Sequence, residues 1–507
     1  MSADPRRHPS RRGVLKLLAG GSALAATATA GGLGAWWAGA AIDNTGAVDF
    51  TRPLPIPPQL QPAQTVDGID RYELIASAGA AELLTGKQTT TWGFNGRHLG
   101  PTLRMTRGRD VDVRVRNELD ETTTVHWHGM NLPARYDGGP HQPISSGAIW
   151  NPRWRVDQPA ATLWYHPHPH GDTSRHVYRG LAGMLIIDDP AAPARLPGSY
   201  GVDDIPLILQ DVSLDADGQL DMGMPLLAPL GRLGNTVLTN GIASAYLDIT
   251  RQTTRLRILN GADARIFTLA LDDGSDFRLV ATDGGLLARP VPMTSLVLSP
   301  GERAEILVTM KAGERRILRN LPNDHGVDVW NRRFIGADDR IDLLELRAAS
   351  MLQISRQVPS ELGGIPTPAP ASAAPDREFD IIRYQINGRP MDMGRIDFGV
   401  LAGSREVWRV RNRDGIPHNF HVHEVQFRVL DRDGTLPADL DGPKDTVFLP
   451  PQSTALLEMR FGEHADPDLP FMYHCHMLTH EDLGMMGQFV ILADGQSVGA
   501  VPHLGHA

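Results

Sequence analysis

The sequence of 507 residues predicts an all-β protein made of three related β-sandwich domains. Short runs of β-branched residues, such as 111–115, 304–308 and 407–410, are bounded by turn-forming residues, and sustained helical periodicity is scarce. Glycine (52 residues) and proline (39 residues) are abundant while aromatic residues make up 6%, which is typical of a turn-rich β protein. The length fits about three domains of ordinary size.

An internal repeat supports this threefold organisation. Residues 114–117 and 409–412 both read Arg-Val-Arg-Asn, and each segment is followed about nine residues later by a His-x-His pair. Between them, residues 257–260 (Arg-Ile-Leu-Asn) begin a unit of the same kind, but no histidine follows. A period of about 150 residues, taken three times, therefore predicts a middle sandwich that lacks the histidines and acts as a spacer.

Changes in composition place the domain boundaries. A proline break at residues 188–190 ends the first domain, and a Pro/Ala/Ser-rich stretch near residues 363–375 precedes the last. We therefore expect domains at 45–190, 195–350 and 376–495, a flexible linker at 351–375 and a tail at 496–507.

Residues 1–44 are expected to form an export signal. Arg11 and Arg12 precede an uncharged stretch, residues 17–42, that is rich in Ala and Gly. A twin-arginine start before an apolar run resembles a Tat signal, so we expect the Tat machinery as a partner and a periplasmic, cell-envelope or extracellular location. The stretch is long enough to span a bilayer, so an uncleaved membrane anchor is one alternative and an ordinary basic tail is another.

The charge balance argues against nucleic acid as a partner. The formal net charge is −10 at pH 7, and the sequence pI is about 6.0. No stripe of Lys and Arg follows the N-terminal segment, although such a stripe is the usual sign of a nucleic-acid-binding surface.

The chain contains one cysteine, Cys475, which lies between His474 and His476. It cannot form an internal disulfide, and its neighbours favour a role as a metal ligand. In a β-strand the two histidines would share one face and the thiol the other, so two metal sites would lie back to back. His480 and Met485 follow at short spacings. With one more histidine, Cys475, His480 and Met485 would complete the His₂Cys site with a weak axial Met that marks a blue-copper centre.

Histidine pairs predict the second metal site. The four His-x-His pairs are His126 and His128, His166 and His168, His421 and His423, and His474 and His476. Each pair projects two imidazoles from one strand face, and eight imidazoles suit a cluster of three copper ions that keeps positions open for dioxygen. Zinc is the rival metal, but structural zinc favours CxxC-type spacing, which the sequence lacks.

His418 is assigned to the mononuclear site by its position. It lies three residues before His421, and this odd offset turns its side chain to the opposite strand face. We therefore expect His418 to join Cys475, His480 and Met485. By contrast, His141, His176 and His464 have no partner at a useful spacing and are expected to be surface residues.

These motifs resemble the four signatures of the three-domain multicopper oxidases. The matching runs are His-Trp-His-Gly at 126–129, Trp-Tyr-His-Pro-His-Pro-His-Gly at 164–171, His-Asn-Phe-His-Val-His at 418–423, and His-Cys-His-Met-Leu-Thr-His at 474–480 with Met485. The similarity covers nearly all of the chain after the signal and includes the turns at 283–285 and 300–303. Within the family, the chain is most similar to bacterial laccases and copper-resistance cuprous oxidases.

The resemblance implies three cupredoxin-like Greek-key sandwiches and four copper ions: one type 1, one type 2 and two type 3. His126 and His421 match the type 2 ligands. His128, His166 and His476 match one type 3 set, and His168, His423 and His474 match the other. His418, Cys475, His480 and Met485 match the type 1 set, and the cluster would bridge the first and third domains.

The resemblance also implies how the reaction proceeds. Electrons from a small reducing substrate would pass from Cys475 through its backbone to His474 and His476, and dioxygen would become water. Asp137 and Glu481 match acids that the family uses to deliver the protons that this reduction consumes. On the residues alone, Asp137 before Gly-Gly is also a common turn residue, and Glu481 could be a solvated loop carboxylate.

The substrate is expected to approach the copper ligand His418. Asp414 matches a carboxylate that binds a labile copper ion in cuprous oxidases, although it could equally be a turn residue before Gly415. The companion methionine expected at position 416 is Ile416, and thioether ligands for Cu(I) are scarce. We therefore expect a laccase-like oxidase of phenols or aromatic amines. Cu(I) oxidation in copper tolerance and a copper-free periplasmic scaffold are the alternatives.

Overall fold

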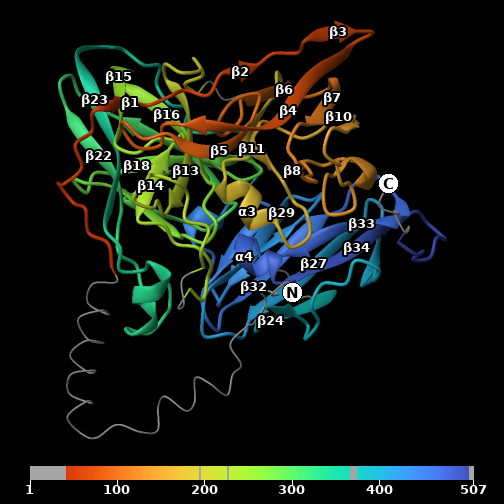
Figure 1. Cartoon of the computed structure of the whole chain (residues 1–507). Helices are drawn as coiled ribbons and strands as arrows, with labels where there is room; N and C mark the ends of the chain where they lie inside the picture. The colour runs from red at the N-terminus through yellow and green to blue at the C-terminus, as the bar shows by residue number, and fades with distance from the viewer. Residues whose placement is uncertain (1–40, 193–195, 225–227, 366–373, 502–507) are drawn as a thin grey trace, which may run out of the picture.

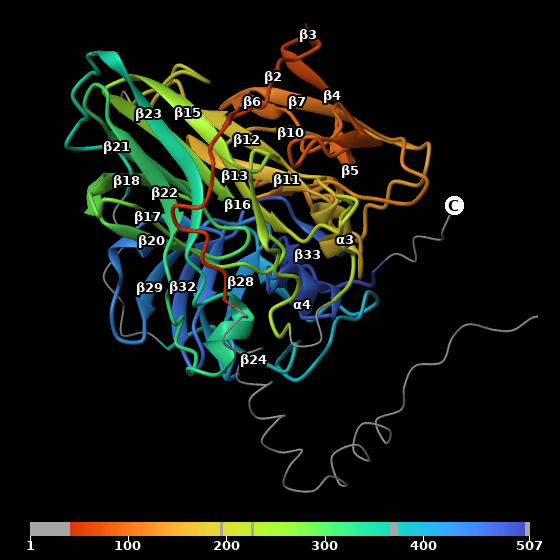
Figure 2. The same cartoon turned by 60° about the vertical axis from the view of Figure 1, so that its left-hand side comes forward.

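The computed structural model describes residues 41–192, 196–224, 228–365 and 374–501. Six β-sheets make up most of this part of the chain, arranged as three pairs (Figures 1 and 2). Each pair encloses its own apolar core. The predicted fold class, all-β with three cupredoxin-like Greek-key sandwiches, is confirmed.

The first domain contributes two of these sheets. One has the order β10 (Arg153–Arg155), β7 (Asp110–Asn117), β4 (Ile69–Ala81) and β3 (Gln64–Val66), with β5 (Thr89–Phe94) beside β4 and β9 (Ile149–Trp150) beside β7. The other has the order β2 (Gln59–Leu60), β6 (Thr102–Thr106), β12 (Gly183–Asp188), β11 (Ala161–His166) and β8 (His126–His128). The short helices η1 (Ala134–Tyr136) and α3 (Thr173–Tyr178) lie in its loops. Strand β8 pairs with the end of β11, which places His126 opposite His166.

The middle domain follows the same plan. One sheet has the order β14 (Thr236–Thr239), β13 (Asp204–Val212), β16 (Thr253–Asn260), β21 (Arg303–Thr309), β18 (Phe277–Thr282) and β19 (Gly285–Met293). The other has the order β1 (Arg52–Pro53), β15 (Ala245–Arg251), β23 (Ile341–Gln353), β22 (Arg315–Asn320), β17 (Phe267–Leu271) and β20 (Ser295–Leu298). The 3₁₀ helix η2 (Asn331–Ile335) precedes β23.

The third domain contributes the remaining pair of sheets. One has the order β25 (Gln385–Ile386), β24 (Arg377–Ile382), β27 (Arg405–Asn412), β32 (Thr454–Arg460), β29 (Phe427–Arg432) and β30 (Pro443–Lys444). The other has the order β26 (Phe398–Leu401), β34 (Met486–Leu492), β33 (Asp466–His474), β28 (His418–Val422) and β31 (Thr446–Leu449). The helices η3 (Ala438–Leu440) and α4 (Leu478–Asp482) lie between strands.

The sequence repeat corresponds to a repeated turn. Asn117, Asn260 and Asn412 end β7, β16 and β27, and each donates its side-chain amide to backbone carbonyls further along the chain at 2.7–3.0 Å. Each side-chain oxygen also accepts the amide two residues further on. An asparagine at the equivalent position of each domain therefore fixes how the chain enters β8, β17 and β28. In the middle domain, β17 is a buried apolar strand in place of a histidine strand.

The observed boundaries differ from the predicted ones at two places. Strand β1 pairs with β15, so the segment before Leu54 extends a sheet of the middle domain rather than the first. Strand β23 runs to Gln353, and Leu362 is buried in the core of the middle domain, where its amide donates to the carbonyl of Ala288. Apolar burial therefore fixes the first part of the predicted linker despite its proline-rich composition.

Two regions of interest fall outside the described residues. These are residues 1–40, which include the predicted signal or anchor, and residues 366–373 of the linker. The last residues of the predicted tail, 502–507, also lie outside. Across the described ranges, the structure contains no helix with the length and apolar character needed to cross a bilayer.

Candidate metal centres

Eight buried histidines converge between the first and third domains, each with 1% or less of its surface exposed. Their ligand atoms lie within 4.8 Å of one another in three groups: His126, His128 and His166; His126, His421 and His423; and His168, His423 and His474. The ring of His476 lies beside those of His128 and His166, with centroids 4.8 and 5.2 Å away. The structure therefore brings all four predicted His-x-His pairs into one cluster.

Strand ends, rather than strand interiors, position most of these pairs. Strand β11 ends at His166 and β33 ends at His474, so Cys475 and His476 lie beyond the strand that the sequence predicted for them. The predicted alternation is nevertheless retained. Cys475 faces His418 and His480, whereas the two flanking histidines face the cluster.

Backbone carbonyls hold several rings so that one nitrogen points into the cluster. The Nδ1–H groups of His126, His166 and His421 donate to the carbonyls of Asp137, Pro167 and Asp445 at 2.8–2.9 Å. The Nε2 atoms of these three rings are buried without a hydrogen-bond partner. An unpaired buried imidazole nitrogen is costly, and metal coordination would satisfy it.

Electrostatics keep the cluster in the state that a metal requires. Burial lowers the pKa of His166, His168, His421 and His423 well below the usual histidine value, and the neighbouring histidines lower it further. The rings are therefore neutral near pH 7, and their lone pairs are available. This donor set of neutral imidazoles fits copper ions.

Two carboxylates stand directly behind one set of three rings. Oδ2 of Asp137 accepts from Nδ1 of His423 at 2.8 Å. The two oxygens of Glu481 lie 3.1 and 3.2 Å from Nδ1 of His168 and His474. Burial raises the pKa of Glu481 well above its usual range. Both acids that the sequence singled out therefore contact cluster histidines, and neither is a solvated loop residue.

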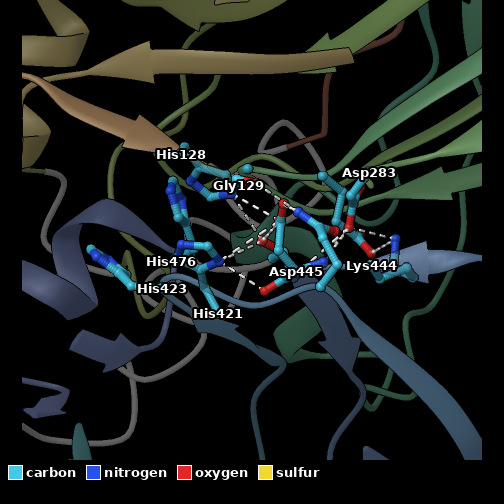
Figure 3. Close-up of polar contacts among 12 residues, drawn as sticks. His128, Gly129, Asp283, His421, His423, Lys444, Asp445 and His476 are labelled. Carbon is cyan, nitrogen blue, oxygen red and sulfur yellow. Dashed lines mark hydrogen bonds and ion pairs between the residues drawn. The ribbon is translucent and has the colours of Figure 1, made fainter. Parts of the chain in front are cut away.

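A buried network of charges that the sequence analysis did not identify supports the opposite side of the cluster (Figure 3). Oδ1 of Asp445 accepts from Nε2 of His128 at 2.9 Å, and Arg303 contacts both oxygens of the same carboxylate at 2.6 and 2.7 Å. Lys444 lies 3.0 Å from both Asp283 and Glu302. No local spacing indicates this network because its members come from all three domains.

The predicted mononuclear site lies within the third domain. Sγ of Cys475 is 3.8 Å from Nδ1 of His418 and 3.5 Å from Nδ1 of His480, so both rings present the same nitrogen to the sulfur. Met485 is fully buried in the same apolar core, and its carbonyl accepts the amide of Cys475 at 3.1 Å. Burial raises the pKa of the metal-free Cys475 thiol to about 12.

Asp414 links the mononuclear site to solvent. Its Oδ2 lies 3.5 Å from Nε2 of the fully buried His418, while 24% of its own side chain is exposed. The hydrogen bond with His418, with smaller contributions from the amides of Arg383 and Gly415, holds the pKa of Asp414 well below its usual value. Asp414 is thus a charged, partly exposed group in contact with the ligand ring.

The middle domain does more than separate its neighbours. None of its described residues belongs to a ligand group. However, the carbonyl of Pro229 accepts from Nε2 of His480 at 2.8 Å, and Arg303 holds Asp445 behind the cluster. The spacer prediction was therefore incomplete, since this domain orients groups at both centres.

Two histidines that were expected on the surface are buried. His176 is fully buried between Thr123 and Glu121, and His141 hydrogen-bonds Gln488. His464 is half-buried. The surface prediction was wrong for the first two because their partners are distant in sequence.

Comparisons with known proteins agree with this site. Two family profiles, both described as multicopper oxidase, match residues 76–192 and 366–495. The multicopper oxidase mco of Staphylococcus epidermidis is 35% identical over 431 residues, covering 84% of this chain and 89% of that protein. The cell division protein FtsP of Escherichia coli is 34% identical over 462 residues, covering 90% of this chain and 96% of that protein.

Solved structures give the same result. A laccase-like multi-copper oxidase, CueO from Ochrobactrum sp., superposes with a TM-score of 0.77 at 35% identity, covering 87% of this chain and 100% of that one. A multi-copper oxidase from Pediococcus acidilactici superposes with a TM-score of 0.77 at 33% identity, covering 91% of this chain and 97% of that one.

Proposed function

Because the chain belongs to the multicopper oxidase family, we propose that it couples one-electron oxidation of a phenol or aromatic amine to reduction of dioxygen to water. About four copper ions, one of type 1, one of type 2 and two of type 3, would supply the electron-transfer and oxygen chemistry when bound. The observation that carries this proposal is the cluster of eight buried histidines, several with an unpaired ring nitrogen, joined through Cys475 to a second ligand group.

Cys475 supplies the connection between the two centres. Its sulfur belongs to the mononuclear group, and its sequence neighbours His474 and His476 belong to the cluster. Adjacent residues in an extended chain are only about 3.3 Å apart, so the two ligand groups are held at a short, fixed covalent separation.

Asp137 and Glu481 are placed to supply protons on one side of the cluster. Each contacts a ring nitrogen there, at 2.8 Å for Asp137 and 3.1 Å for Glu481. The raised pKa of Glu481 favours the protonated form of this carboxyl group, whose proton can be released into the cluster.

The rim at His418 supports an aromatic donor. The partly buried Tyr384 has its ring 4.8 Å from that of the ligand His480, the partly buried Ile416 lies two residues before His418, and Asp414 offers a charged oxygen at His418. A phenol hydroxyl can donate to Asp414 while the ring contacts the apolar groups. Ile416 offers no thioether sulfur for Cu(I), which favours an organic donor over the cuprous alternative.

The relatives named FtsP make a copper-free role in the cell envelope the second candidate. The two candidates differ in what the ligand residues do. A scaffold has no need for eight buried imidazoles of which several have a ring nitrogen without a hydrogen-bond partner, whereas an oxidase does.

Metal analysis and oxygen uptake test the proposal together. The reconstituted protein should bind about four copper ions, turn blue, and consume oxygen with 2,6-dimethoxyphenol faster than with Cu(I). Cys475→Ser should remove the blue colour and the oxygen uptake. A colourless, copper-poor protein after reconstitution would support the scaffold, and a large preference for Cu(I) would support the cuprous oxidase.

Export by the Tat machinery to the periplasm, cell envelope or medium is part of the same proposal. It rests on Arg11 and Arg12 before the apolar stretch at 17–42. Replacing both arginines with lysine should retain the protein in the cytoplasm, as fractionation would show. Association of the wild-type protein with the membrane fraction would indicate the anchor alternative.

A further inference from the structure

Asn419 connects the middle domain to the peptide that joins the two metal centres. It follows His418 on β28 and is fully buried. Its Nδ2 donates to the carbonyl of Pro300 at 2.8 Å and to Oγ of Ser299 at 3.0 Å. Its Oδ1 accepts the amide of His476 at 2.5 Å and lies 3.5 Å from Sγ of Cys475.

The partners of Asn419 allow one orientation of its amide group. The carbonyl of Pro300 can only accept a hydrogen bond, so the nitrogen must face the middle domain. The backbone amide of His476 can only donate, so the oxygen must face the third domain. Every hydrogen bond of the group is then satisfied, and the side chain is fixed between the two domains.

The two branches that lead away from Cys475 are held differently. On one side, His474 has Glu481 and the carbonyl of Cys475 next to its ring. On the other side, neither ring nitrogen of His476 has a hydrogen-bond partner. His476 is fixed by the hydrogen bond from its backbone amide to Asn419 and by the close packing of its ring on Gly301. A Cβ atom at position 301 would lie 2.9 Å from the ring.

We propose that Asn419 is a positioning residue for internal electron transfer, which fixes the Cys475–His476 peptide against the middle domain. This inference rests on the proposed function, because it requires copper at both centres. It also gives the ligand-free middle domain a role in the path between them, since Pro300 and Ser299 hold the side chain in place.

One substitution tests the side chain of Asn419. Asn419→Ala removes both side-chain contacts but keeps the backbone N–H. Electron transfer from the reduced type 1 site to the cluster, followed by flash photolysis, should slow on the order of tenfold. The KM for the phenol should not change, because the side chain of Asn419 is fully buried and contacts Pro300 and His476.

Asn320→Ala is the matched control. Asn320 is a buried asparagine of the middle domain with the same two-armed arrangement, since it accepts the amide of Thr268 and donates to the carbonyl of Asp339. Its removal should lower stability to a similar degree, yet the transfer rate should equal that of the wild type.

The outcomes are distinguishable from failure of the proposed function. If the wild-type protein binds no copper or consumes no oxygen, the proposed function is wrong. If the wild type is blue and active but Asn419→Ala transfers electrons at the wild-type rate, or is slowed no more than Asn320→Ala, the positioning role is wrong. Should Asn419→Ala fail to fold, the milder Asn419→Ser decides the question, since a wild-type rate in that variant also overturns the proposal.

Discussion

His128 and Asp445 come from different domains, and their Nε2 and Oδ1 atoms lie 2.9 Å apart in a contact from which solvent is excluded. The backbone carbonyl of the same aspartate accepts from Nδ1 of His421 at 2.8 Å, so one residue orients a ring from the first domain and a ring from the third. Arg303 of the middle domain closes the arrangement by contacting both carboxylate oxygens. The cluster is therefore held by all three domains.

This arrangement makes Asp445→Asn a strongly destabilising change. It removes the nearer of the two carboxylates beside the buried guanidinium of Arg303, and breaking a buried pair in this way typically costs about 3–5 kcal/mol. It should also weaken copper binding at the cluster while the blue colour remains, because the type 1 ligands do not contact Asp445. Urea unfolding and the type 2 EPR signal measure the two effects. Arg315→Ala, in the exposed pair with Glu345, should change stability by less than about 0.5 kcal/mol.

Glu481→Gln should slow oxygen reduction and leave the blue absorption in place. Glutamine keeps the shape of the side chain beside His168 and His474 but has no acidic proton to release. The expected loss in kcat is on the order of 100-fold, and Asp137→Ala should act in the same direction. Oxygen uptake and absorption spectra check this. Loss of the blue band in either variant would show a structural role in place of proton delivery.

Sequence patterns predicted the residues that local spacing controls. The alternation of side chains along a strand was sufficient to assign His418 to Cys475 rather than to the cluster, and the repeat of about 150 residues was sufficient to predict the domains. The contacts that Asn419 and Arg303 make with other domains could not be predicted in this way, because those partners lie 119 or more residues away in the chain. Folding alone brings such groups together.

The metal-free protein should lose stability in acid. Burial lowers the pKa of His325 to about 4, from an unfolded value near 6.5. Above pH 6.5 neither state binds the proton, so stability is unaffected; below it the unfolded chain binds the proton and the folded chain does not. As the pH falls from 6.5 to 4, each buried histidine with such a lowered pKa should reduce the unfolding free energy by about 1.4 kcal/mol per pH unit.

His325→Asn provides a direct check of that pH dependence. His325 has a φ of 51°, which asparagine tolerates better than most residues, so the substitution removes the titrating group with little backbone strain. Urea midpoints of the metal-free variant should fall less steeply with acid than those of the wild type. Parallel pH profiles would show that His325 does not contribute.

Asp414→Asn should distinguish proton acceptance from simple support of the ligand ring. The wild-type carboxylate stays charged in mild acid because its pKa is held well below the usual value, so it can accept the phenol proton as the electron passes to His418. Asparagine cannot accept that proton, and kcat/KM for a phenol should fall on the order of 100-fold. An outer-sphere donor that carries no proton, such as ferrocyanide, should be oxidised at nearly the wild-type rate. An equal loss with both donors would mean that Asp414 orients His418 and takes no part in proton transfer.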